Sequence, residues 1–121
     1  MNWPATGSAA LALAVALGAF GAHGLKDRLD AYATGIWEKA VFYHFVHALG
    51  LLIVPLMARA GMISDAHSGR VCWFLAAGMV LFSGSLYALA LSGVKALGAV
   101  TPLGGLSFIA AWVVLAWALA R

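Results

Sequence analysis

Four long stretches of this chain carry no charged side chain, and they leave few residues for anything else. They are residues 1–25, 40–58, 71–94 and 96–120. Each reaches the roughly 18–20 residues with which a helix crosses about 30 Å of hydrocarbon. The chain is only 9% charged, whereas a soluble domain is about one-quarter charged. The pattern predicts an all-α membrane protein with four transmembrane helices in one domain, residues 1–121.

The first apolar stretch is expected to be a span rather than a removable signal peptide. No Lys or Arg precedes Lys26, so the basic region that begins a signal peptide is missing. The stretch is also longer than the apolar region of a signal peptide, and further spans follow it.

The connections between the four stretches are short, which predicts antiparallel neighbours and an up-and-down bundle. The expected spans are residues 5–22, 37–57, 71–92 and 101–119. Aromatic residues are expected to form belts at the two membrane faces. One belt would hold Trp3, Trp73 and Trp117, and the other Tyr32 and Trp37.

Residues 26–39 are the only charge-rich part of the chain. Apolar residues recur there at the spacing of one helical face, namely Leu25, Leu29, Tyr32 and Ile36. This predicts a short amphipathic helix that lies in the interface between the first and second spans. Thr34-Gly35 is expected to end it, with Thr34 as the cap of the second span.

Polar side chains gather toward one end of the predicted bundle. Up-and-down topology places the end of span one, the first half of span two, the end of span three and the start of span four at that end. The residues are His23, Lys26, Tyr43, His44, His47, Ser83, Ser85, Tyr87 and Thr101. Because an ionisable group at membrane depth is a functional hypothesis by default, they are predicted to form one polar pocket.

Several ligands suit such a pocket. His44 and His47, three residues apart on one helix, are candidate ligands of a transition metal or members of a proton relay. A mixed aromatic and polar pocket also suits a small amphiphile such as a quinone or a lipid head group. A haem would need facing histidines, for which His23 is the available partner. The structural alternative is that these side chains only hydrogen-bond across helices.

Small residues mark predicted helix contacts. Ala10, Ala14, Gly18 and Ala22 recur every fourth residue, which lets another helix approach closely. Further predicted packing positions are Gly21, Gly84, Gly104 and Gly105.

Four motifs in order resemble one known family. They are the stretch 18–26, the set Trp37-Glu38, Tyr43-His44 and His47-Ala48-Leu49, the stretch 82–87, and Thr101-Pro102-Leu103-Gly104-Gly105. They are similar to the family called domain of unknown function 423, which includes bacterial inner-membrane proteins and the eukaryotic transmembrane protein 256. The resemblance implies a four-span protein of the bacterial inner membrane with both termini in the cytoplasm. It implies no activity.

Familiar catalytic patterns are missing from the sequence. It has no phosphate loop, no paired intramembrane carboxylates, no Cys-x-x-Cys and no Gly-x-Ser-x-Gly elbow. Enzymatic activity is therefore not predicted. The seven basic residues are scattered over loops and the C-terminus, which is typical of membrane flanks rather than of a nucleic-acid site.

Three functions follow as hypotheses. The first is a small binding protein that holds a metal, a proton or an amphiphile in the polar pocket. The second is a structural or accessory subunit that forms a homo-oligomer through its small-residue stripe. The third is a transporter or channel, which needs an oligomer because a single four-span chain makes a poor conduit.

Overall fold

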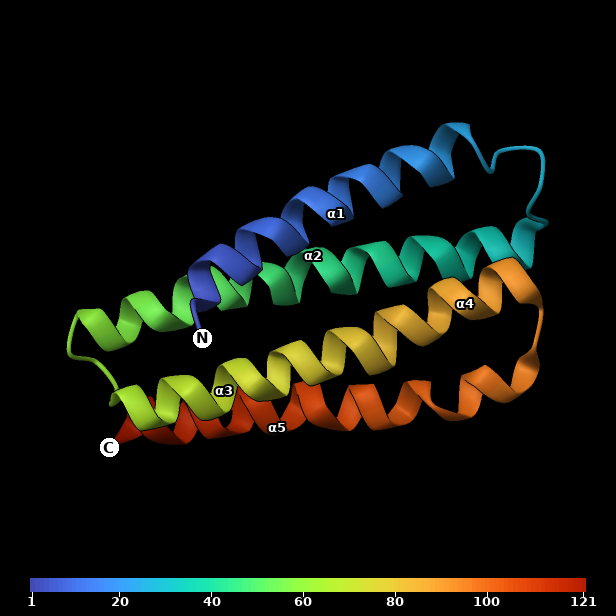
Figure 1. Cartoon of the computed structure of the whole chain (residues 1–121). Coiled ribbons are helices and arrows are strands. Elements are labelled where there is room, and N and C mark those ends of the chain that lie inside the picture. Colours follow the sequence, from blue (N-terminus) through green and yellow to red (C-terminus); the bar gives the residue numbers. More distant parts are fainter.

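The computed structural model describes residues 1–121 and consists of helices joined by short turns (Figure 1). The helices are α1 (Trp3–His23), α2 (Ala31–Arg59), α3 (Asp65–Gly78), α4 (Ser85–Ser92) and α5 (Thr101–Ala120). A π-helical segment, Met79–Gly84, joins α3 to α4 in one continuous span, and a 3₁₀ turn, Lys95–Ala99, precedes α5. Four helices are long and apolar enough to cross a membrane. The predicted all-α, four-span fold is confirmed.

Side chains and glycines define where the helices begin and end. Asn2 caps α1 by accepting a hydrogen bond from the Ala5 N–H at 3.1 Å, and Ser64 caps α3 in the same way. Gly93 ends α4 with φ +70°, a left-handed conformation that glycine adopts without steric cost. The chain can therefore reverse direction within a few residues, as an up-and-down bundle requires.

No separate interfacial helix forms between α1 and α2. Residues 24–30 make turns, and α2 begins at Ala31 and continues through Thr34-Gly35. The cap is Asp30, whose carboxylate accepts from the Ala33 N–H at 2.8 Å. An aspartate is at least as good an N-cap as a threonine, and one glycine costs a helix only about 1 kcal/mol. The cap therefore lies four residues before Thr34, and the helix starts at Ala31.

The apolar residues of this region pack inward instead of facing the membrane surface. Leu25 is buried with Trp37 and Ala90, and Leu29 and Ile36 pack against that cluster. This packing holds the connection against the start of α2 and the end of α4. Tyr32 is the exception in the predicted apolar face, because it is 68% exposed.

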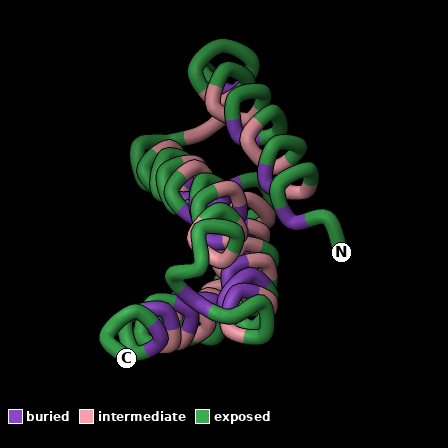
Figure 2. Tube along the Cα trace, turned by 90° about the vertical axis from the view of Figure 1, so that its left-hand side faces the viewer, coloured by how far each residue is buried: buried purple, intermediate pink, exposed green.

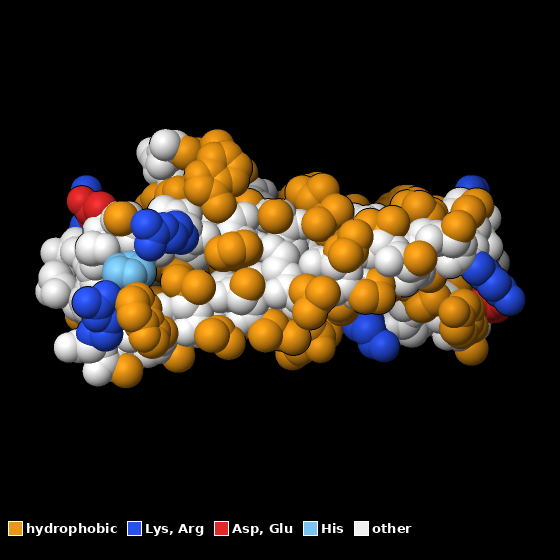
Figure 3. All heavy atoms as spheres, turned by 90° about the horizontal axis from the view of Figure 1, so that it is seen from below, with side chains coloured by type: hydrophobic (Ala, Val, Ile, Leu, Met, Phe, Trp, Pro, Cys, Tyr) orange, Lys and Arg blue, Asp and Glu red, His pale blue; other side chains and the backbone are white.

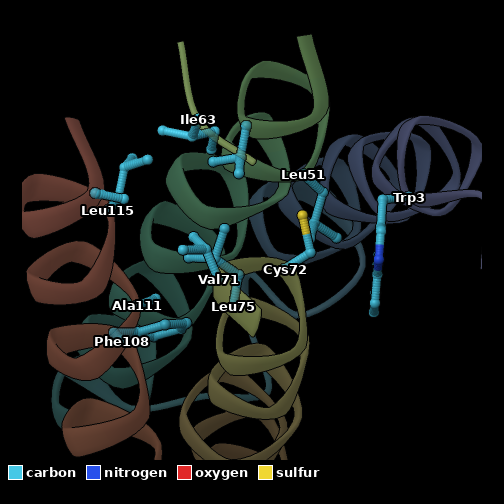
Figure 4. Packing of buried hydrophobic residues seen from close by; sticks show 11 residues of the cluster. Trp3, Leu51, Ile63, Val71, Cys72, Leu75, Phe108, Ala111 and Leu115 are labelled. Carbon is cyan, nitrogen blue, oxygen red and sulfur yellow. The ribbon is translucent and has the colours of Figure 1, made fainter. Parts of the chain in front are cut away.

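The main core lies among α2, α3 and α5 (Figure 4). Leu51, Val71, Cys72 and Leu75 are fully buried there, and Phe108 is nearly so. Helix α1 lies against α2 at one edge and is the least buried of the four spans (Figure 2). It also meets α3 where the rings of Trp3 and Trp73 pack edge to face, 4.8 Å apart.

Charged side chains gather toward the two ends of the molecule, and hydrophobic ones cover the middle (Figure 3). Trp73, Trp117 and Tyr32 are more than half exposed, as belt residues are expected to be. Trp3 and Trp37 differ from the prediction, because they are 8% and 3% exposed. Each packs between helices, and Trp37 satisfies its N–H inside the protein.

Glycines lie where the helices come closest. A Cβ on Gly7 would lie 2.9 Å from the Leu51 Cβ, and one on Gly50 would lie 2.9 Å from Leu75 Cδ1. A Cβ on Gly104 would overlap the backbone of Phe82. Since apolar side chains gain little by leaving lipid for one another, such close packing is what joins helices in a membrane.

The other predicted packing residues lie in varied surroundings. Ala14 is fully buried, Ala10 and Gly18 are half-buried, and Ala22 is exposed. A Cβ on Gly84 or Gly105 would make only an ordinary contact at 3.9 Å.

Gly104→Ala should destabilise the contact between α5 and the π segment, because the new methyl group would meet backbone atoms that cannot rotate away. Overpacking of this kind costs about 1–3 kcal/mol. The free energy of unfolding in mild detergent measures the effect. Gly105→Ala is the matched control, and equal stabilities of the two variants would contradict the predicted packing.

Candidate functional site

The structure does not gather the nine predicted polar residues into one pocket. It divides them among four places: a His44–Tyr87 pair with Ser83 beside it, Tyr43 with His47, a Ser85–Thr101 pair, and the exposed end of α1 with His23 and Lys26. Each place faces different neighbours.

His44 and Tyr87 join α2 to α4. The imidazole Nδ1 lies 2.9 Å from the phenol oxygen of Tyr87. His44 also lines a groove together with Ala10 of α1. Close by, the Ser83 hydroxyl donates to the Ala40 carbonyl of α2 at 2.8 Å. Ser83 lies in the π segment, a rare helical form that is frequent at functional sites.

A groove runs along this pair between α1, α2 and the span formed by α3 and α4. Its volume is about 380 Å³. The wall is largely apolar, and its polar residues are Thr6, His44, Ser83 and Tyr87. We call it the His44 groove. It is lined by Thr6, Ala10, Leu13, Leu17, His44, Ala76, Met79, Val80, Ser83, Gly84 and Tyr87.

His47 faces α5 rather than α4. Its Nδ1 lies 2.7 Å from the Tyr43 carbonyl oxygen, one turn earlier in the helix. Its ring stacks on Phe108 of α5 with ring centres 3.5 Å apart. His44 and His47 therefore do not converge on one point, and no group of three His, Cys, Asp or Glu side chains in the chain is placed to hold a metal.

Ser85 and Thr101 join α4 to the start of α5. Their hydroxyl oxygens lie 2.6 Å apart, and the Ser85 hydroxyl also contacts the Phe82 carbonyl at 3.0 Å. These bonds satisfy the two hydroxyls within the protein, which is the usual role of such residues between membrane helices.

His23 and Lys26 are exposed where α1 ends. Lys26 lines a second groove between α1 and α2, which lies apart from the His44 groove and includes none of the histidines. We call it the Lys26 groove.

Two further hydrogen bonds between helices were not predicted. The Trp37 indole N–H donates to the Leu17 carbonyl of α1 at 2.9 Å, and the Ser107 hydroxyl donates to the Phe74 carbonyl of α3 at 2.7 Å. The Trp37 ring also packs against Tyr87, with ring centres 4.8 Å apart. The only signal in the sequence was a tryptophan opposite a glycine-rich helix end, which does not reveal that the two meet.

Comparison with known proteins places the chain among small membrane proteins. The family described as "Protein of unknown function (DUF423)" matches residues 17–105. A UPF0382 membrane protein of Staphylococcus epidermidis is 50% identical over 103 residues, which cover 85% of this chain and 82% of that protein. The UPF0382 membrane protein YwdK of Bacillus subtilis is 47% identical over 105 residues, which cover 85% and 83%.

No solved structure matches the chain. The family match, the identity to these relatives and the four apolar helices agree with one another. The chain belongs to the DUF423 family, whose relatives bear the name UPF0382 membrane proteins.

Proposed function

We propose that this protein binds a small amphiphile in the His44 groove. The ligand would have an elongated apolar part along the groove and a hydroxyl group at the His44–Tyr87 pair. The observation that carries this proposal is a hydrogen-bonded polar pair in the wall of an otherwise largely apolar groove within the membrane-spanning part. A polar pair that served only to join helices would not need a groove beside it.

The hydrogen-bonding pattern of the pair favours a ligand that donates. We take the neutral His44 ring to carry its proton on Nε2, which leaves Nδ1 free to accept a hydrogen bond. His44 Nδ1 is then an acceptor, and the Tyr87 hydroxyl donates to it. The Tyr87 oxygen accepts no hydrogen bond within the protein, so we propose its lone pairs as the acceptor for a ligand hydroxyl; they offer nothing to a carbonyl or an ether.

The size of the groove agrees with this ligand class. Its volume of about 380 Å³ lies in the range of 300–1,000 Å³ that is typical of small-molecule sites. Leu13, Leu17 and Val80 supply apolar wall on both sides. The groove holds the polar end and the first part of a chain, and the remainder would lie in the lipid.

The alternative of an oligomeric accessory subunit has less support. The stripe proposed to join copies includes Ala14, which is fully buried within the chain, and Ala10, which lines the His44 groove. Its use between copies would require α1 to leave its present position. An oligomeric transporter has no supporting polar path, because the polar residues are divided among separate places.

We also propose that the protein lies in the bacterial inner, or plasma, membrane with both termini in the cytoplasm. The bacterial relatives support the membrane. Three basic residues flank the spans on the side of the termini (Arg59, Arg70 and Arg121) and four on the other side (Lys26, Arg28, Lys39 and Lys95). The charge count therefore does not set the direction, and the proposed orientation rests on the family resemblance. A reporter that is active only in the cytoplasm, fused after Arg121, tests the orientation.

Binding is tested with 1-dodecanol and methyl undecyl ether, which have the same number of heavy atoms and of which only the alcohol carries a hydroxyl donor. Native mass spectrometry from mild detergent counts the molecules retained. We expect the alcohol to be retained about two- to tenfold better than the ether, the usual value of one hydrogen bond. Tyr87→Phe should abolish this preference, and Val80→Trp should block both probes by filling the groove.

Val113→Trp is the matched control, because Val113 is also exposed but lies on α5 and does not line the groove. It should bind as the wild type does. Circular dichroism should show unchanged helicity in every variant. Equal retention of alcohol and ether by the wild type would contradict the proposed hydroxyl site. Equal retention of the probes by Val80→Trp and Val113→Trp would contradict binding in the His44 groove.

A further inference from the structure

We propose that the Lys26 groove binds a phospholipid with a phosphate and a primary ammonium in its head group, as in phosphatidylethanolamine. The groove has a volume of about 490 Å³ and lies between the end of α1, the connection and the first half of α2. It is lined by Gly18, Gly21, Ala22, Lys26, Leu29, Thr34, Trp37, Glu38, Val41, Phe42 and Phe45. This inference does not rest on the function proposed for the His44 groove.

The groove is hollow because α1 contributes only small residues to it. Gly18, Gly21 and Ala22 form that wall, and none has a side chain larger than a methyl group. The indole of Trp37 lies against Gly21 and holds the two helices apart at this level. A chain-like molecule can therefore lie along α2 without displacing any large side chain.

Polarity changes along the groove as it does along a lipid. Lys26, Thr34 and Glu38 line the end near the connection, whereas Phe42 and Phe45 line the part farther along α2. Thr34 and Phe45 are about 16 Å apart along the helix at 1.5 Å per residue. One leaflet is about half of the 30 Å hydrocarbon thickness, so the groove has the length of one acyl layer.

The charges at the mouth select the head group. Lys26 and Glu38 line the same groove, yet no salt bridge joins them. The lysine ammonium suits the phosphate, and the glutamate carboxylate suits a primary ammonium that donates hydrogen bonds. An anionic lipid would leave Glu38 without a cation. A choline head group has no N–H to donate.

The other charged groups at this end do not line the groove. Asp27, Arg28 and Lys39 are exposed, and the Asp30 carboxylate caps α2. Lys39 is therefore a matched control for Lys26 in charge and exposure. Ala19, exposed on α1 outside both grooves, is a matched control for Ala22.

The test is reconstitution into vesicles of equal parts palmitoyl-oleoyl phosphatidylethanolamine, phosphatidylglycerol and phosphatidylcholine. Extraction in mild detergent and native mass spectrometry then identify the retained lipid. We expect phosphatidylethanolamine to be retained about threefold over each of the others, as a pair of exposed charge contacts allows. Glu38→Gln should remove the preference over phosphatidylglycerol, and Lys26→Gln and Ala22→Phe should each reduce retention of all three lipids.

Lys39→Gln and Ala19→Phe should retain lipid as the wild type does. Retention of the three lipids in the proportions of the vesicle would overturn the proposal, as would identical behaviour of Glu38→Gln and Lys39→Gln. Tyr87→Phe separates this site from the His44 groove. It should lose its preference for the alcohol probe and keep its preference for phosphatidylethanolamine.

Discussion

The position of α1 depends on the side chain of Trp37. Its N–H bonds to the Leu17 carbonyl of α1 at 2.9 Å, and its ring lies against Gly21 on one side and Tyr87 on another. In lipid, apolar helices gain little from contact alone, so a hydrogen bond and close packing decide where a helix lies. The indole both attaches α1 and keeps it at a distance from α2. It lines the Lys26 groove, and its neighbour Tyr87 lines the His44 groove.

The remaining helices are positioned by large side chains that fit against glycines. Phe108 of α5 lies against Gly78, and Gly104 of α5 lies against the backbone of Phe82 in the π segment. The same segment presents Ser83, which bonds to the Ala40 carbonyl of α2. Packing of α5 and hydrogen bonding to α2 thus meet at the π segment, which also forms part of the wall of the His44 groove. The candidate site is therefore built by the contacts that join the helices.

The four spans and the end at which the polar residues lie were predictable, because they follow from segment length, charge and alternating direction. The direction in which each side chain points was not predictable from the sequence. His44 and His47 are about 60° apart around one helix, yet His44 faces α1 and α4 while His47 faces α5. Lipid-facing and helix-facing residues are alike apolar here, so periodicity cannot orient the helix. The same ambiguity led to the wrong expectation that Trp37 would lie in an interfacial belt.

Trp37 bonds to α1 and packs against Tyr87 of α4, so a distance between spin labels on α1 and α4 measures whether this side chain positions α1. Labels at Ala19 on α1 and Leu91 on α4, both exposed, are introduced with Cys72→Ala and measured by double electron–electron resonance in nanodiscs. We expect one narrow distribution, which Trp37→Ala shortens or broadens while Trp117→Ala leaves it unchanged. Superimposable distributions with and without Trp37 would contradict the account.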